Sequence, residues 1–273
     1  MPDMPIETLK TSAEPNALKT AAQTLAASER SEDHAALKPF LADAKFLDRL
    51  NTVKEYQINR PKRLRLWAVL DVLRRNKAPS AQRVLMDLTT APAYNDDEMP
   101  ARADLLIQAC AHIRPAPPQV ITYWEKHCKP DDGHAPLTIE TLLENSSPPA
   151  LALLETKMAD SGHDADERVS WMHKSILPRR NDLPVLQSCR RMLGGSLPQS
   201  LRPALVETLF DYRPAEWFTP SKPVRCPPRQ FMSGEAKAEL CAIGEMALKQ
   251  IALTPEQQAV VKGVLVEIGG KEK

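Results

Sequence analysis

A proline-marked repeat constrains the fold of this 273-residue chain more than any other feature of its sequence. Five times a helical stretch ends in polar or basic residues, a proline follows, and a short apolar segment begins. One apolar residue marks each copy, and successive marks are 36, 33, 32 and 32 residues apart: Val84, Val120, Leu153, Val185 and Trp217. A fixed period of about 20–50 residues is typical of chains that stack near-copies of one structural unit.

Proline is unusually frequent in this chain, with 25 residues against only 9 glycines. A proline in the first turn of a helix loses no hydrogen bond, because its missing N–H would have no partner there, and its ring fixes φ near the helical value. The residue before a proline is disfavoured in a helix, so each proline also ends the helix that precedes it. We therefore expect each proline group to separate two helices.

Apolar residues at spacings of three and four fill the stretches between the prolines, as in 66–73 and 106–113, and this spacing predicts amphipathic helices. Strand signals are almost absent, since the one Asp-Gly pair, Asp132-Gly133, lies between two helical patterns and not between alternating ones. The predicted fold is all-α. It consists of about five helical hairpins, each of which buries its apolar face by stacking on its neighbours.

In its period, its paired helices and the proline that opens each second helix, the chain resembles the HEAT-like α-solenoids over residues 61–218. The resemblance implies a stacked superhelix that serves mainly as a binding surface, and it implies no chemistry. In such proteins the second helices usually line the concave surface. On that basis the candidate exposed contacts are Arg83, Tyr123, Trp124, Glu155 and Arg190.

The repeats are expected to form the middle of the chain. We expect a disordered leader over 1–15, N-terminal helices over 16–60, HEAT-like repeats over 61–218, a proline-rich basic loop over 219–234 and a C-terminal helical cap over 235–273. The last helix is predicted to begin at Thr254-Pro255-Glu256-Gln257, which has the N-cap threonine, the first-turn proline and the glutamine of a capping box.

Composition excludes several classes of protein. The net charge is +1, from 36 basic and 35 acidic residues, which excludes a uniformly basic nucleic-acid coat. No stretch approaches the roughly 18 apolar residues of a membrane helix, and the polar N-terminus does not resemble a signal peptide. Five irregularly spaced cysteines favour a reducing compartment over a disulfide framework, so we expect a cytoplasmic protein without membrane contact.

Basic residues recur where the first helix of several units is predicted to end: Arg74, Arg75, Arg114, Arg179, Arg180 and Arg213. In a stacked fold these residues would form an arginine edge that could bind phosphates or an acidic segment through bidentate contacts. Around its first members, residues 60–83 carry eight basic side chains against Asp71, a local charge of +7. The same cations could instead only stabilise helix C-termini, by about 0.3–1 kcal/mol each. The third unit, with Asn145-Ser146-Ser147, interrupts the edge.

Cysteine and histidine offer a possible reactive group but no convincing metal site. Cys226 lies beside Arg225 in the proline-rich loop, where neighbouring cations would favour a reactive thiolate; the alternative is an ordinary surface thiol. Two pairs, Cys110 with His112 and His127 with Cys128, lack the spacing of three or four that brings ligands together on a helix. We therefore expect neither a metal nor a cofactor.

Four tryptophans raise one enzymatic alternative, because solenoid DNA glycosylases of the HEAT-like type line their concave face with aromatics and an acid. Here the tryptophans fall on both helix types, so they cannot all line one face, and core packing explains them better: Trp67, Trp124, Trp171 and Trp217. Glu125 is the one carboxylate that this alternative would use. The predicted function is a non-enzymatic adaptor that binds another protein, and the alternative is a nucleic-acid binder or HEAT-like DNA glycosylase that uses the arginine edge.

Overall fold

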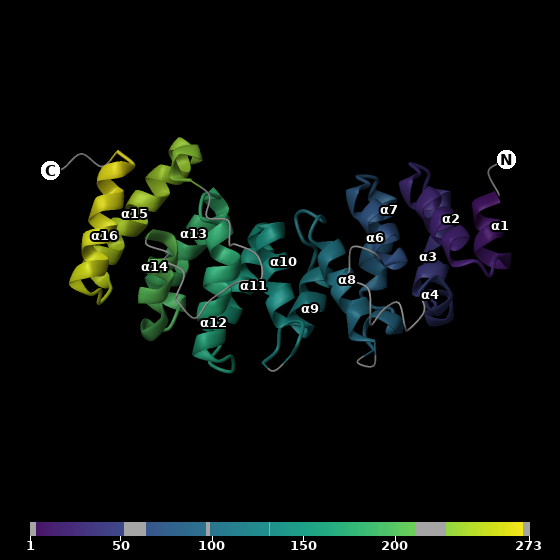
Figure 1. Cartoon of the computed structure of the whole chain (residues 1–273), viewed down its shortest axis with the longest axis horizontal. Coiled ribbons are helices and arrows are strands. Elements are labelled where there is room, and N and C mark those ends of the chain that lie inside the picture. The colour runs from purple at the N-terminus through teal and green to yellow at the C-terminus, as the bar shows by residue number, and fades with distance from the viewer. Residues whose placement is uncertain (1–3, 52–63, 97–98, 131, 211–227, 270–273) are drawn as a thin grey trace. The chain divides into compact units, whose positions relative to one another are not determined.

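The computed structural model describes residues 4–51, 64–96, 99–130, 132–210 and 228–269 (Figure 1). Every regular element in these ranges is a helix, which confirms the all-α class. The chain divides into two compact units, Met1–His127 and Cys128–Lys273.

The first unit is built from pairs of short helices. α2 packs against α6, α3 against α7, and α6 against α8, so successive pairs contact one another through equivalent members. Residues 4–11 of the expected leader form a helix instead, because Leu9 is fully buried where this helix packs against α2. The elements are α1 (Met4–Thr11), α2 (Pro15–Ala27), α3 (Ser31–Ala42), α4 (Ala44–Leu50), α6 (Arg65–Arg75), α7 (Pro79–Leu88), η2 (Pro92–Tyr94), α8 (Pro100–Cys110) and α9 (Pro118–Lys126).

The second unit contains two rows of helices. In one row α13 packs against both α11 and α15, and in the other α14 packs against both η3 and α16. The helix expected around Trp217 lies outside the described residues. The elements are α10 (Ala135–Asn145), α11 (Pro148–Ala159), α12 (Ala165–Trp171), η3 (Met172–Ile176), η4 (Leu177–Arg179), α13 (Leu183–Arg191), η5 (Met192–Ser196), η6 (Gln199–Leu201), α14 (Arg202–Phe210), η7 (Arg229–Phe231), α15 (Gly234–Gln250) and α16 (Pro255–Glu267).

Prolines begin the helices as predicted. α7, α9 and α11 each start on a proline, α13 has one in its first turn, and α16 carries the predicted capping box between Thr254 and Gln257. The repeat register is less regular than the sequence spacing indicates. Val84 and Leu153 are the sixth residues of their helices, whereas Val120 and Val185 are the third. All four are buried. The apolar face of a helix includes a residue every three or four positions, so both the third and the sixth residue can lie on it.

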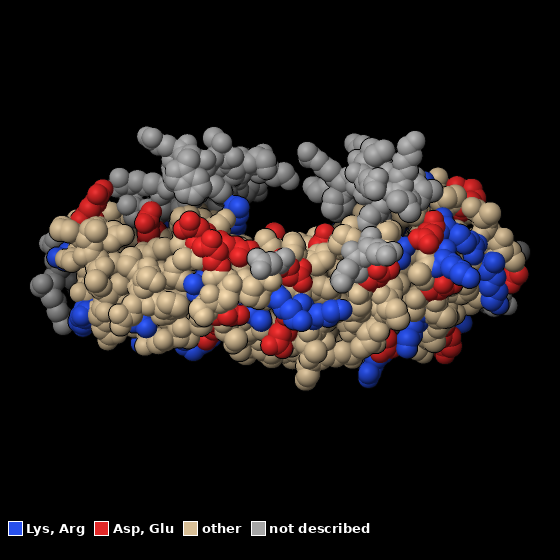
Figure 2. Space-filling view, turned by 90° about the horizontal axis from the view of Figure 1, so that it is seen from below, with Lys and Arg blue, Asp and Glu red and all other residues tan. Residues whose placement is uncertain are grey.

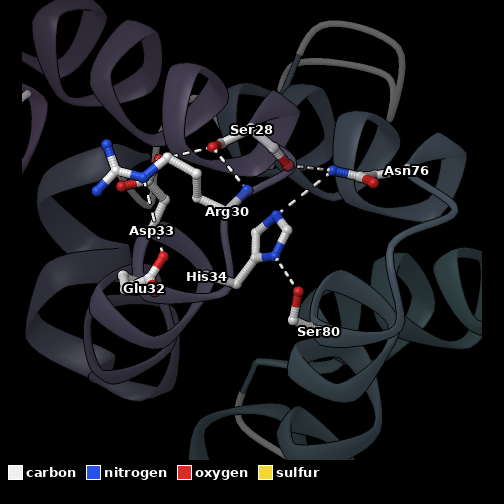
Figure 3. Close-up of polar contacts among 7 residues, drawn as sticks. All are labelled: Ser28, Arg30, Glu32, Asp33, His34, Asn76 and Ser80. Carbon is white, nitrogen blue, oxygen red and sulfur yellow. Dashed lines mark hydrogen bonds and ion pairs between the residues drawn. The ribbon is translucent and has the colours of Figure 1, made fainter.

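Asn76 links the α2–α3 pair to the α6–α7 pair (Figure 3). Its amide nitrogen donates to the carbonyl oxygens of Ala26 at 2.9 Å and Ser28 at 2.8 Å, both at the end of α2. Its amide oxygen accepts from the backbone N–H of Ala78 at 2.9 Å, just before α7 begins. One side chain thus satisfies backbone groups that two helix ends would otherwise leave without partners.

His34 extends this network from α3. It is fully buried, and its Nδ1 lies 2.7 Å from Ser80 Oγ on α7, while its Nε2 lies 3.4 Å from the amide nitrogen of Asn76 (Figure 3). Helices α2, α3, α6 and α7 therefore meet at a connected cluster of polar side chains. Such a cluster stabilises the fold only when all its members are hydrogen-bonded.

Asn76→Asp should lower the free energy of unfolding of the first unit by about 2–3 kcal/mol, because a carboxylate cannot donate to the two carbonyl oxygens and would repel them. Urea unfolding followed by circular dichroism measures the change. Asn16→Asp is the matched control, since Asn16 accepts from Arg65 Nε at 3.0 Å and a carboxylate accepts as well. Equal effects of the two substitutions would contradict the role assigned to Asn76.

Candidate functional site

The first two residues of the predicted arginine edge are held by one acid. Arg74 Nε lies 2.7 Å from Asp71 Oδ1, and Arg75 lies 2.6 Å from Asp71 Oδ2. The guanidinium of Arg74 also stacks on the Trp67 ring at 4.9 Å and contacts His112 Nε2 at 2.7 Å. Arg74 therefore connects α6 to the end of α8 and has a structural role, whereas the side chain of Arg75 is 69% exposed.

The remaining residues of the arginine edge differ from one another in exposure. Arg114 is exposed, whereas Arg180 is only 7% exposed. Arg179 lies 3.5 Å from Asp182, one turn further along the chain. Arg213 lies outside the described residues. The described arginines at equivalent positions of the repeats thus lie in different environments. They do not share one geometry that would bind phosphate.

Tyr123 and Trp124 are buried, so their prediction as exposed contacts is wrong. The Tyr123 hydroxyl donates to the Tyr94 carbonyl at 3.1 Å, and Trp124 Nε1 donates to the Ile107 carbonyl at 3.3 Å. Both rings fill space between α9 and the preceding helices, where large amphipathic side chains find a partner for their polar atom. Glu125, next along α9, is exposed.

Trp171 follows the core-packing interpretation as well. It is 2% exposed and packs edge to face on His163, with ring centroids 4.9 Å apart. Trp67 is half-buried beneath Arg74, and Trp217 lies outside the described residues. The three described rings are thus packed against neighbouring side chains, as predicted.

Glu155 and Arg190 lie on the row formed by α11, α13 and α15, where they belong to separate ion pairs. Glu155 Oε1 accepts from Ser188 Oγ and from Arg191, each at 2.7 Å. Arg190, on the same helix as Arg191, lies 3.4 Å from Glu239 of α15. We call the charged residues of this row the α11–α13–α15 surface: Glu155, Arg190, Arg191 and Glu239. Ser188 is fully buried and does not belong to it.

Sequence reasoning missed Ser188, Arg191 and Glu239. The Arg190-Arg191 pair is visible in the sequence, but which helix faces it is not, because α15 follows a proline-rich segment that breaks the repeat. Arg83, the last predicted contact, is exposed on α7 in the first unit. The two arginines of α13 have side chains that are 51% and 54% exposed, so they remain open to solvent although they are paired.

The described cysteines are poor nucleophiles. Burial raises the pKa of Cys128 and of Cys189 to about 12, and it raises the pKa of Cys110 further. Cys110 points into the core while His112, two residues on, is exposed, so these two side chains point apart as the spacing predicts. Cys226 lies outside the described residues.

Comparison with known proteins adds no family. No protein-family model matches the sequence, and neither the curated proteins nor the solved structures give a match. Among the described residues, no helix has the length and apolar character needed to cross a membrane.

Arg74→Gln should lower the free energy of unfolding by about 1–2 kcal/mol, because it removes the cation–π contact with Trp67 and the ion pair with Asp71. Arg83→Gln, the control on the exposed side of α7, should change it by less than about 0.5 kcal/mol. Urea unfolding of the two variants beside the wild type makes the comparison. A loss no larger for Arg74 than for Arg83 would contradict the structural role assigned to Arg74.

Proposed function

We propose that this chain is a HEAT-like helical-repeat adaptor that binds another protein along the row of its second helices and catalyses no reaction. Support comes from the α11–α13–α15 surface, because two second helices, α11 and α13, pack side by side there and α15 of the C-terminal part extends the row. A row of this kind lets a long segment of a partner contact several helices at once. In such a stack the second helices would line a concave face.

The charges on this surface suit a partner of mixed charge. Acidic and basic side chains alternate across the row, from Glu155 on α11 to Arg190 and Arg191 on α13 and Glu239 on α15. The two arginine side chains are 51% and 54% exposed, so acidic groups of a partner can reach them, whereas Glu239 and Glu155 are only 15% and 16% exposed and hold the arginines in place. The surface would then give specificity more than affinity.

The nucleic-acid alternative based on the arginine edge has weaker support. Arg74 and Arg75 are both paired with Asp71, and Arg180 is buried. These three arginines therefore do not form a line of exposed, unpaired cations. An enzyme of the glycosylase type would also need exposed aromatic rings, whereas Trp124 and Trp171 are in the core.

Affinity capture from native lysate tests the adaptor proposal. Ala152→Arg combined with Gln187→Arg places two bulky cations on exposed positions of α11 and α13, and it should abolish retention of the bound partner. Glu140→Arg on the exposed side of α10 changes the net charge by the same amount and should leave capture unchanged. Equal retention by both variants, or specific capture by neither the wild type nor the control, would contradict the proposal.

A further inference from the structure

The polar cluster of His34, Asn76 and Ser80 in the first unit contains one side chain that can change its charge near neutral pH. His34 of α3 is fully buried, and both of its ring nitrogens face polar atoms of other elements (Figure 3). An imidazole in water becomes charged below about pH 6.5. The effect of that charge on this cluster depends on which of the surrounding atoms donate and which accept.

Backbone groups fix the orientation of the Asn76 amide. Its nitrogen lies 2.9 Å and 2.8 Å from the carbonyl oxygens of Ala26 and Ser28, which can only accept. Its oxygen lies 2.9 Å from the backbone nitrogen of Ala78, which can only donate. A flipped amide would lose all three hydrogen bonds. His34 Nε2, which lies 3.4 Å from the same amide nitrogen, therefore faces a donor.

This contact determines where the neutral ring of His34 carries its proton. Because Nε2 faces an N–H donor, it must present its lone pair. The proton of the neutral ring then lies on Nδ1, which donates it to Ser80 Oγ at 2.7 Å. The neutral ring satisfies both contacts. An imidazolium would instead direct a second N–H at the amide nitrogen of Asn76, which has no lone pair to accept it.

No carboxylate among the described residues forms an ion pair with His34 that would stabilise its charged form. Asp33 accepts from Ser28 Oγ at 2.6 Å and lies 3.8 Å from Arg30, and Asp87 of α7 lies 2.7 Å from Lys38. Figure 2 shows acidic side chains beside basic ones on the face of the first unit that it presents. The other charged side chains of α2, α3, α6, α7 and the turns between them form no ion pair or hydrogen bond with His34: Lys19, Glu29, Glu32, Asp71, Arg74, Arg75, Lys77 and Arg83. Hydrogen bonding therefore decides which form of the ring the fold accepts.

We propose that His34 is a pH-sensitive link in the first unit, and that its protonation detaches α3 from the α6–α7 pair. A buried charge without a partner is costly, so the imidazolium leaves its position for water, and the contacts with Asn76 and Ser80 are lost with it. The unfolded chain then binds one proton more than the intact fold, so stability falls as the pH falls through the range in which free imidazole titrates. This property is separate from the adaptor function proposed for the α11–α13–α15 surface, which does not contain these residues.

Urea unfolding of the full chain, followed by circular dichroism at pH 7.5 and pH 5.5, tests this link. The variant is His34→Gln, because glutamine can accept from Asn76 with its oxygen and donate to Ser80 with its nitrogen but takes up no proton. For a histidine that is protonated below about pH 6.5 in the unfolded chain and stays neutral in the fold, the unfolding equilibrium constant rises about tenfold between these pH values. The rise in the wild type should therefore exceed the rise in His34→Gln about tenfold, since the other histidines are common to both.

Leu37→Ala is the matched control, since Leu37 is fully buried on the same helix and its loss destabilises α3 without removing a titratable group. This variant should keep the pH dependence of the wild type. Protection of the Ala78 N–H against hydrogen exchange, which depends on its bond to Asn76, should fall about tenfold at pH 5.5 in the wild type and not in His34→Gln. Nitrogen NMR of the histidine-labelled wild type at pH 7.5 should show the His34 proton on Nδ1. A proton on Nε2, or equal pH dependence in the wild type and His34→Gln, would overturn the proposal.

Discussion

Burial of one apolar stripe per helix against a neighbouring helix is the interaction on which this structure depends. The α-helices with proline in their first turn are short, from nine residues in α9 and α13 to thirteen in α2 and α16. Isolated helices of fewer than about 12–15 residues are only marginally stable in water, because too few hydrogen bonds form to offset the free-energy cost of the first turn. Their stability must therefore come from packing against neighbouring helices. Proline determines where each of these helices starts, and packing determines whether the helix forms.

Sequence reasoning predicts well the features that depend on local chemistry and apolar spacing. The all-α class, the prolines in first helical turns, the capping box at Thr254 and the buried Trp171 all follow from such signals. Sequence reasoning fails where the burial of a side chain depends on which neighbouring helix covers it. Tyr123 and Trp124 belong to a second helix and were expected at the surface, but contacts with Tyr94 and Ile107 bury them. Leu9, in the expected leader, is buried in the same way by α2, which no local pattern indicates.

The arginines of this chain show why a count of basic residues does not locate a binding surface. Arg74 and Arg75 stand in the most basic stretch of the sequence, yet Asp71 pairs with both. Arg191 is likewise paired, with Glu155 of α11, a contact that the sequence does not indicate. The pairing of a guanidinium therefore depends on which helices pack together, and not on the local density of arginine.

Circular dichroism of a peptide spanning residues 134–160, which form α10 and α11, tests the dependence on neighbouring helices most directly. Both helices have proline in the first turn, so the peptide retains the local signal on which the sequence prediction rests. The account predicts that this peptide is mostly unfolded alone, because neighbouring helices no longer bury Ile139, Leu142 and Leu154. Helicity close to that of the same residues in the full chain would show that local signals suffice, and it would contradict the account.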